Sequence, residues 1–314
     1  MMIKITILFL LFAMLPFSSH AQSNGIIKIY DGQFLKDGFY YPGHYGRLVM
    51  VDGIKVKTYP TKDAKKLNKN LSIVRNWFAT TFNWNSYDNK GSDIIAIVNL
   101  EKHFFLGRYE GKNQNAGWDD LHGLMIFGAG GIQIGGFADA IDIIAHEYTH
   151  AIINATSNIG HTYEAGALSE HFGDLMGANI NYSLGLKKNP FHIGHHMLRT
   201  NLRLKSPVVR NMENPHQGMI KQPITVNEWQ EKFPGNSEVH TINGIPNKMA
   251  SIIIKELGWE NTRGMFFKII TSNLKYLITF KDYVHILLEE CKGIKSEKDA
   301  CSVVEKAATE VGLL

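Results

Sequence analysis

The stretch Ala145-His146-Glu147-Tyr148-Thr149-His150-Ala151 contains the pattern His-Glu-x-x-His. Residues four apart lie on one face of an α-helix, about one turn from each other, so His146 and His150 can reach the same metal ion. Glu147 stands beside the first histidine and points near that ion without having to bind it. Because two imidazole ligands favour zinc or a similar transition metal, the stretch predicts a metal-binding helix with a carboxylate next to the metal.

A chance match on a solvated helix face is the alternative, because the chain has 14 histidines. An accidental match has a probability of roughly a few per cent in such a sequence. The residues around the motif disfavour that alternative, since several isoleucines flank it and predict a buried helix. They are Ile141, Ile143, Ile144, Ile152 and Ile153.

A third metal ligand is available on the next predicted helix. Glu170 and Asp174 are four residues apart there and share a face. One can bind the metal while the other holds a ligating histidine by its second ring nitrogen. Two histidines, one carboxylate and one open position are typical of a hydrolytic zinc site, whereas a structural site is closed by four protein ligands. A structural zinc protein is therefore disfavoured.

The composition is that of an ordinary globular protein. The chain has 314 residues, of which 44% are hydrophobic and 20% charged, and its formal net charge is +4. This length suffices for one large domain or two lobes that share a core. The small positive charge predicts neither a nucleic-acid partner nor binding to a membrane surface.

The first 21 residues differ from the rest. A start with Lys4 precedes an apolar run over residues 5–17, and Ser19-His20-Ala21 offers small residues at both positions that a signal peptidase needs. A membrane anchor is the alternative, but the run is too short to span a bilayer comfortably. We therefore expect a signal peptide over residues 1–21 and a secreted chain, extracellular or periplasmic, without a membrane span.

The two cysteines, Cys291 and Cys301, lie near the C-terminus, each at the edge of a predicted helix. Export makes oxidation available, so we expect a disulfide between them, with two unpaired thiols as the alternative. Neither has a second cysteine or a histidine at metal-ligand spacing, so we assign them no catalytic role.

Hydrophobic spacing predicts strands in the N-terminal part and helices after it. Strands are expected at 94–98, 124–127 and in a hairpin, 48–51 with 54–57, around Asp52-Gly53. Helices are expected at 64–78, 139–155, 165–182, from near Pro246, and at 262–276, 279–292 and 298–311. The pattern indicates an α+β chain. Its β-rich N-terminal lobe, residues 22–155, ends in the motif helix, and its α-helical C-terminal lobe covers residues 156–314.

Several segments together resemble the thermolysin-like zinc metalloproteases. The two carrying the metal ligands are HEYTHAI (146–152) and EAGALSEHFGD (164–174), with Glu170 twenty residues after His150. Further similar segments are TFNWNSYDNKG (81–91), NAGW (115–118), VRNMENP (209–215), VHTINGI (239–245) and the C-terminal EVGL (310–313). The resemblance covers about residues 60–314. It implies the thermolysin-like α+β fold, with the active-site helix between two lobes, and a secreted endopeptidase that hydrolyses internal peptide bonds.

The resemblance also implies roles for matched positions at the metal. One catalytic zinc ion would be bound by His146, His150 and Glu170. Glu147 would be the general base that takes a proton from the attacking water and passes it to the departing amine. Asp174 would orient His146.

Other matched positions concern the substrate. His240 would donate a hydrogen bond to the oxyanion, and Arg210 would hold a substrate carbonyl. Asn115 and Ala116 would pair with the substrate backbone as an added strand. The pocket just after the cut bond is matched by apolar residues, which predicts cleavage before Leu, Phe, Ile or Val. These residues are Ile143, Met197 and Val209.

The chain departs from the family pattern near the oxyanion. The family usually has a tyrosine there, and the matching position is His161, which can also donate a hydrogen bond; Tyr163 is a second candidate. The family often pairs the second active-site histidine with an aspartate five residues earlier. That position is Gly235, with Asn236 next to it, so the orientation of His240 stays open.

A further departure concerns calcium. Many family members carry a pair of calcium ions near the active-site helices, held by carboxylates. Asp142 keeps one such position, but it can equally be a solvated or capping residue. The remaining positions fall on neutral residues and histidines, which are poor calcium ligands, so we expect no calcium pair. They are Asn181, Asn189, His192 and His195.

These observations favour a monomeric endopeptidase with a peptide or protein substrate. About 40 residues separate the signal peptide from the first family-like helix, so we expect no large propeptide. The alternative is a catalytically weak relative that binds peptide or a partner protein in the same cleft, motivated by His161 and Gly235. The retained Glu147 disfavours it, because a binding module does not need the base.

Overall fold

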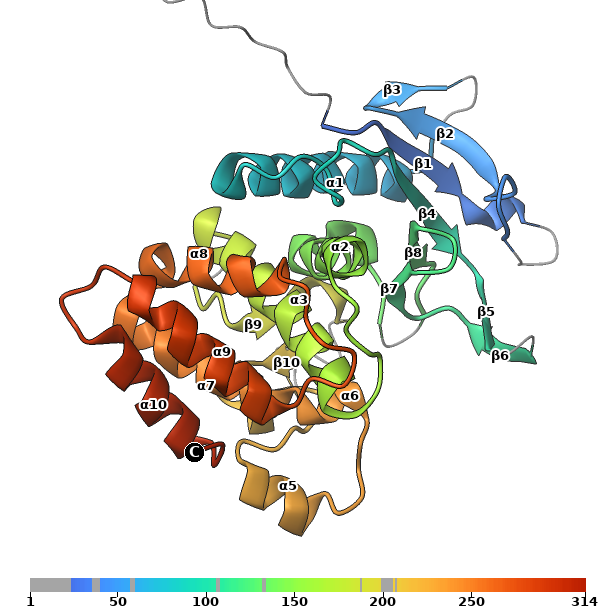
Figure 1. Ribbon diagram of the computed structural model, residues 1–314. Coiled ribbons are helices and arrows are strands. Elements are labelled where there is room, and N and C mark those ends of the chain that lie inside the picture. The colour runs from blue at the N-terminus through green and yellow to red at the C-terminus, as the bar shows by residue number, and fades with distance from the viewer. Residues whose placement is uncertain are drawn as a thin grey trace, which may run out of the picture.

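The computed structural model describes residues 24–35, 40–56, 60–105, 108–131, 134–186, 188–198, 206 and 208–314. The expected signal peptide lies outside these ranges. Within them, strands dominate the N-terminal part and helices the C-terminal part, with the motif helix between the two (Figure 1). The expected α+β class is confirmed.

The N-terminal part is built on a six-stranded sheet of order β3-β2-β1-β4-β8-β7. Strand β4 is parallel to β1 and β8, and the other pairs are antiparallel. The expected hairpin forms between β2 and β3, where Asp52 and Gly53 take positive φ angles of 44° and 81°. The strands of this sheet are β1 Ile27–Asp31, β2 Arg47–Val51, β3 Ile54–Lys55, β4 Ile94–Leu100, β7 Ala116–Asp119 and β8 Leu124–Gly128. Strands β5 Lys102–Phe105 and β6 Arg108–Lys112 pair separately.

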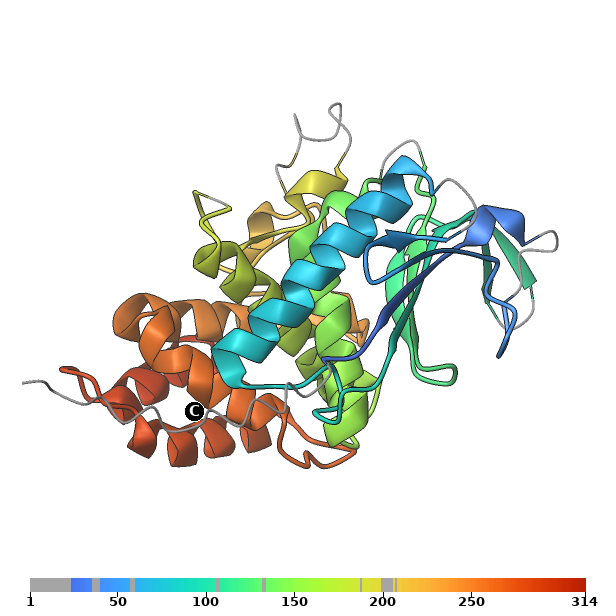
Figure 2. The same ribbon diagram turned by 90° about the horizontal axis from the view of Figure 1, so that it is seen from above.

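Helix α1, Lys62–Phe82, covers one face of this sheet and also packs against α2 (Figure 2). Leu67, Leu71, Val74 and Phe78 are fully buried, as expected from their three- and four-residue spacing. The helix thus joins the sheet to the motif helix in one hydrophobic core.

The motif lies on α2, Ile141–Thr156, which packs along α3, Tyr163–Ser183. Two glycines of α3 allow this close approach. A Cβ atom at Gly173 would lie 2.5 Å from Nδ1 of His146, and one at Gly177 would lie 2.7 Å from the carbonyl oxygen of Asp142. Real Cβ atoms do not come so close, so glycine at these positions lets the two ligand-bearing helices touch.

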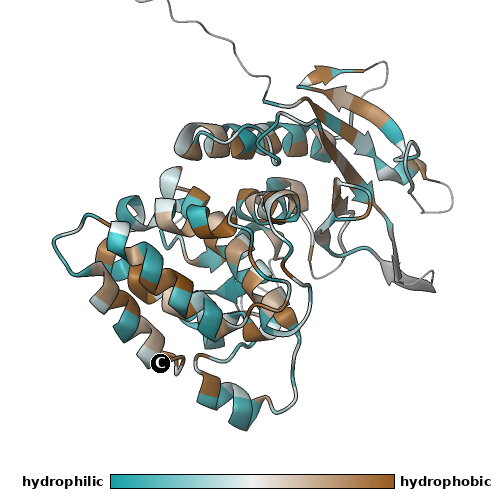
Figure 3. Cartoon of the chain, viewed as in Figure 1, coloured by the Kyte–Doolittle hydropathy of each residue, from teal (hydrophilic) through white to brown (hydrophobic). Residues whose placement is uncertain are grey.

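Helices make up most of the remaining chain, and their hydrophobic residues alternate with hydrophilic ones (Figure 3). A disulfide joins Cys291 to Cys301 between α9 and α10. None of the described helices is both long and apolar enough to cross a membrane. The helices are α5 Val226–Lys232, α6 Val239–Ile242, α7 Gly244–Leu257, α8 Trp259–Ile270, α9 Phe280–Glu290 and α10 Ala300–Glu310. A small sheet pairs β9 His192–Ile193 with β10 Arg210–Asn211. Short 3₁₀ helices lie at Gly32–Phe34, Phe137–Asp139, His195–Met197, Pro215–Gln217 and Cys291–Gly293.

Candidate active site

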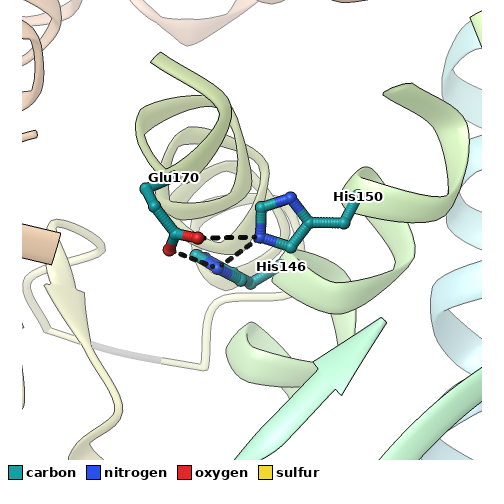
Figure 4. Close-up of side chains that lie close together, drawn as sticks. All are labelled: His146, His150 and Glu170. Carbon is teal, nitrogen blue, oxygen red and sulfur yellow. Dashed lines mark hydrogen bonds and ion pairs between the residues drawn. The ribbon is translucent and has the colours of Figure 1, made fainter. Parts of the chain in front are cut away.

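Three side chains converge between α2 and α3, as Figure 4 shows. The Nε2 atoms of His146 and His150 lie 3.0 Å apart. The Glu170 carboxylate places Oε2 3.2 Å from His146 and Oε1 3.5 Å from His150. In the part of the chain that the structure describes, no other trio of histidine, cysteine or acidic side chains meets this spacing. The three residues predicted to bind a metal are therefore brought together.

The other nitrogen of each imidazole is held by a neighbouring side chain. Nδ1 of His146 lies 3.1 Å from Oδ1 of Asp174, and Nδ1 of His150 lies 3.1 Å from Oγ of Ser169. When Nδ1 carries the ring proton, the Nε2 lone pairs of both histidines point to the space between the two rings and Glu170, where one metal ion could bind. Ser169 is not predicted from the sequence, although it directly precedes Glu170.

This set of donor atoms fits a zinc ion. Oε2 of Glu170 is buried and receives no hydrogen bond from the residues that the structure describes. Two imidazole lone pairs and a carboxylate that face one another repel unless a cation lies between them. Two histidine nitrogens and one carboxylate are the protein ligands of a hydrolytic zinc site with an open position.

The electrostatics of the site keep its carboxylates charged. Burial acts to raise the pKa of Glu170, but His150 and His240 outweigh it and hold this pKa well below its usual value. Burial also opposes ionisation of Asp174, and there the Arg210 guanidinium and the bond to His146 hold the pKa low. Anionic Glu170 and Asp174 suit the binding of a cation.

Asp174 is fully buried and accepts hydrogen bonds from four side chains. Besides His146, Arg210 donates from Nε at 2.8 Å and from Nη2 at 2.5 Å. Asn243 and Asn247 donate their amide protons at 3.0 and 2.9 Å. The expected partner of His146 is thus also the point where β10 and two segments of the C-terminal lobe meet. Neither asparagine is predicted from the sequence to belong to the site.

A cleft of about 670 Å³ opens over these side chains. Glu147 lines it together with His146, His150 and Glu170, which we call the metal trio. The general base expected from the sequence therefore faces the same space as the metal ligands, which is the placement that proton transfer to and from a bound substrate requires.

Strand β7 is the open edge of the sheet and lines the cleft. Asn115 accepts a hydrogen bond from the Gly128 amide at 2.9 Å, and its own amide is bonded to Asn113. Ala116 opposes Phe127 in this antiparallel pair. Because bonded pairs alternate along an antiparallel ladder, the main-chain groups of Ala116 point to the open edge. The main chain of Asn115 is satisfied internally, which leaves its exposed side chain for the cleft.

His240 reaches the trio from α6. Its Nε2 lies 3.3 Å from Oε2 of Glu170, and its Nδ1 lies 2.6 Å from Oε1 of Glu238. Glu238 also accepts hydrogen bonds from the His240 amide and the Thr241 hydroxyl. The hydrogen bond with His240 lowers the pKa of Glu238 to about 2. Glu238, two residues before His240, therefore occupies the place for which Gly235 and Asn236 offered no acid. Its helix N-cap position is the signal that could have shown this.

The predicted apolar pocket forms one wall of the cleft. Ile143, Met197 and Val209 are all buried and line it. Met219 and Ile220 join them, because the Ile220 amide donates to the Val209 carbonyl at 3.1 Å and holds this segment beside β10. These two residues are not predicted from the sequence, since the turn between Arg210 and Met219 brings them back to the pocket.

Comparison with known proteins decides the family. Residues 55–154 match the thermolysin metallopeptidase catalytic domain, and residues 157–313 match the α-helical domain of the same family. The chain belongs to the thermolysin family of metallopeptidases. It therefore carries both domains that the sequence resemblance implied.

Individual relatives agree with this assignment. Bacillolysin of Bacillus amyloliquefaciens is 29% identical over 274 residues, which cover 85% of this chain and 48% of bacillolysin. Neutral protease NprE of Bacillus pumilus is 30% identical over 250 residues, covering 78% and 75% of the two chains. The chain thus spans about half the length of bacillolysin. In the solved structures, the precursor of protealysin from Serratia proteamaculans shares the fold, with a TM-score of 0.75, 22% identity and coverage of 92% and 88%.

In this thermolysin-family chain, His161 lies at the rim of the cleft. Its side chain is 68% exposed, and its Nε2 lies 2.9 Å from Oδ2 of Asp120, which raises its pKa. Asp120 follows β7 in the opposite wall, so the pair crosses the cleft. Tyr163, the second candidate, is equally exposed. The structure thus holds the donor nitrogen of His161 at Asp120 and not among the metal ligands.

Asp142 is fully buried in the first turn of α2 and is held by donors of the protein. Its Oδ2 accepts from the Asn181 amide at 3.3 Å and from the Gly194 main chain at 3.1 Å, and its Oδ1 accepts from the Ile143 main chain. Asn189 donates to Glu213 at 2.9 Å. The remaining two positions of the expected calcium region, His192 and His195, line a second cleft.

Proposed function

We propose that this chain is a secreted zinc endopeptidase that hydrolyses internal peptide bonds, with a preference for large apolar residues after the cut bond. One observation carries the proposal. The Nε2 atoms of His146 and His150 lie 3.0 Å apart, and the two carboxylate oxygens of Glu170 lie 3.2 and 3.5 Å from them, in a cleft that Glu147 also lines. Membership of a metallopeptidase family supports the same activity.

The chemistry follows from the roles of the side chains. A zinc ion held by the trio would act as a Lewis acid and would lower the pKa of water in the site towards neutrality. Glu147 accepts a proton from the attacking water and delivers it to the departing amine. Asp174 holds the Nδ1 proton of His146, so that Nε2 faces the ion.

His240 supplies a hydrogen bond to the oxyanion of the tetrahedral intermediate. Glu238 accepts from its Nδ1. Burial acts to lower the pKa of His240, but the charge of Glu170 and the bond to Glu238 outweigh it and raise this pKa, which favours the ring with protons on both nitrogens. Nε2 of that ring donates into the cleft, and Glu238 fixes the ring orientation.

The substrate adds as a strand at the edge of β7. The main chain of Ala116 and the side chain of Asn115 face it there. Nε and Nη2 of Arg210 both donate hydrogen bonds to Asp174, so Nη1 is the atom that would donate to a substrate carbonyl. The side chain after the cut bond enters the pocket formed by Ile143, Met197 and Val209.

The test is cleavage of casein by the mature protein with and without a zinc chelator. We expect cleavage that stops with the chelator and returns when zinc is added back. Cleavage that continues at full rate with no bound metal would refute the zinc mechanism. Mass spectrometry of the fragments shows whether internal bonds are cut.

A second candidate is a catalytically weak relative that binds peptide in the same cleft. It is favoured by the bond between His161 and Asp120, which keeps an expected oxyanion donor at the rim. It predicts casein binding by the zinc-loaded protein without detectable fragments, and the same cleavage assay separates the two candidates.

We propose that the calcium pair of the family is absent. Asn181 and the main chain of Gly194 donate to the carboxylate oxygen of Asp142 that a calcium ion would need. Thermal unfolding of zinc-loaded protein in millimolar calcium and in a calcium-selective chelator should give the same midpoint. A rise of many degrees with calcium that disappears in Asp142→Ala would contradict this.

We also propose export and a monomeric state. A relative from Staphylococcus epidermidis, 30% identical over 207 residues that cover 66% of this chain and 38% of the relative, is named extracellular elastase. N-terminal sequencing of the mature protein should begin near Gln22, and light scattering should give the mass of one chain. Retention of residues 1–21 would contradict signal cleavage.

A further inference from the structure

A fully buried glutamine holds the main chain of His240. Nε2 of Gln222 lies 2.7 Å from the His240 carbonyl oxygen and 2.5 Å from Oδ1 of Asn243. Both bonds can form together, because a side-chain amide nitrogen carries two protons. The carbonyl end of Gln222 is buried and has no hydrogen-bond partner among the described residues. Gln222 therefore gives both of its donor bonds to the segment that carries His240.

The contacts continue from Asn243 to the metal trio. Its Nδ2 donates to Oδ2 of Asp174 at 3.0 Å, and Oδ1 of Asp174 lies 3.1 Å from Nδ1 of His146. Gln222, Asn243 and Asp174 are each fully buried. An unbroken line of side-chain hydrogen bonds therefore runs from the His240 carbonyl to the metal ligand His146.

His240 needs such anchoring because of the element that carries it. It belongs to α6, a helix of only four residues, and its side chain is 43% exposed. Helices of this length are not stable by themselves, so contacts with the rest of the protein decide where they lie. A donor to a transition state must be held within about 0.5 Å of its working position. Glu238 holds the ring and the main-chain amide of His240, but it belongs to the same short segment and so does not fix that segment against the rest of the protein.

We propose that Gln222 is a positioning residue. With Asn243, it ties the segment that carries His240 to Asp174, so that the oxyanion donor and the metal ligand His146 form one hydrogen-bonded unit. This inference rests on the proposed peptidase function and adds to it a residue that lies outside the cleft lining. Its consequence is that loss of Gln222 impairs the chemical step and leaves metal and substrate binding intact.

The first variant is Gln222→Met, which keeps the length of the side chain and removes both donors. We expect kcat to fall roughly 10- to 100-fold, less than or equal to the loss when an oxyanion donor is deleted outright. KM and zinc content should stay within about twofold, since no substrate or metal contact is lost. Thr262→Val is the matched control, because Thr262 of α8 is also fully buried and donates to the carbonyl of Gly258, which precedes that helix. It should lower the unfolding midpoint and leave kcat unchanged.

A binding experiment separates positioning from a general structural effect. A phosphonamidate peptide places a tetrahedral oxyanion where the intermediate has one, so its affinity follows stabilisation of the transition state. In Gln222→Met its affinity should fall by the same factor as kcat, whereas the affinity for a product peptide should not change. Equal losses for both ligands would overturn the proposal.

Asn243→Ala removes the next residue in the same series of hydrogen bonds. It tests the proposal if Gln222→Met does not fold. It should lower kcat with KM unchanged, and the double variant should lose no more than the larger single loss. A kcat within twofold of the wild type in either folded variant, or strictly additive losses, would overturn the proposal. If the wild type cleaves no peptide, the proposed function is wrong as well. If the wild type is active and Gln222→Met has the same kcat, only the role of Gln222 is wrong.

Discussion

Oε1 of Glu238 lies 2.6 Å from Nδ1 of His240, while Nε2 of the same ring lies 3.3 Å from the metal-ligand carboxylate of Glu170. The acid that orients the histidine therefore comes from two residues before it, at the N-cap of α6. The family pattern predicts an acid at Gly235, whose lack of a side chain left the orientation of His240 open. Glu238 is the partner that orients His240 in its place.

Glu238→Met should lower kcat by about 10-fold or more, because the His240 ring loses the acceptor that orients it and favours its protonated form. Glu238→Gln should lie between this variant and the wild type, since an amide oxygen still accepts from Nδ1 without the charge. KM and zinc content should change little in both. Steady-state kinetics with metal analysis tests this. Wild-type kcat in Glu238→Met would show that the contact plays no part in catalysis.

Glu147→Gln should keep zinc and the fold but lose roughly 10²–10⁴-fold in turnover, because the proton acceptor is gone while the ligands remain. Glu231→Gln on α5 is the control, since Glu231 is exposed and should tolerate the change without loss. Peptide cleavage by the purified, zinc-loaded variants is the measurement. Activity at half the wild-type rate in Glu147→Gln would rule out the proposed mechanism.

Asp174→Ala should weaken zinc binding by about 10–100-fold, because His146 loses the partner of its Nδ1. The structure adds a second effect, since Arg210 is buried and would lose its counter-charge. We expect the free energy of unfolding to fall by about 3–5 kcal/mol. The double variant Asp174→Leu with Arg210→Met should recover stability but not zinc affinity. Urea unfolding and zinc competition titrations distinguish the effects; full zinc affinity in Asp174→Ala would contradict the assignment.

A peptide library should show preferred cleavage before Leu, Phe, Ile or Val, because Ile143, Met197 and Val209 form an apolar wall. Burying such a side chain contributes about 1.5–3 kcal/mol. Met197→Ala should enlarge the pocket and shift the preference towards Phe. A library profile dominated by charged residues at that position, in the wild type, would refute the pocket assignment.

The free energy of unfolding should fall in acid, and protonation of the buried His171 should contribute to this. Its Nδ1 lies 2.8 Å from Oδ1 of Asn247, and its Nε2 lies 3.1 Å from the hydroxyl oxygen of Tyr283. Burial lowers its pKa from 6.5 to about 4, so the folded state prefers the neutral ring. The unfolded chain binds the proton first, so this contribution is complete above about pH 6.5 and is lost as pH falls towards 4. His171→Gln should therefore flatten the decline of the unfolding midpoint between pH 7 and 4.5. Parallel curves for variant and wild type would exclude the role of His171.

Elements with strong local patterns are predictable from the sequence. The hairpin around Asp52-Gly53 forms because this pair accepts the positive φ angles of a tight turn. Helix α1 forms where Leu67, Leu71, Val74 and Phe78 recur at helical spacing and are buried. Such elements depend on neighbours in the chain, and these are visible in the sequence.

Boundaries without a local signal are predicted less well. The helix expected at 262–276 runs from Trp259 to Ile270. Gly258 is its N-cap, so it begins earlier than expected, and Thr271 is its C-cap, so it ends earlier. Leu274 and Ile278 continue the apolar spacing but are buried from the loop. The short helices α5 and α6 were not predicted, since four to seven residues carry too little periodicity.

The sequence by itself determined the metal-binding helix, the types of its ligands and the carboxylate beside them. Four-residue spacing on one helix places His146 and His150 together whatever surrounds them. Only the tertiary structure decided that Glu238 orients His240, that Gln222 holds its main chain and that Asp120 pairs with His161. Most of these contacts join separate elements, and even Glu238 meets His240 only through the bend at the start of α6. Hydrogen bonds of this kind depend on distances in space, which spacing along the chain does not encode.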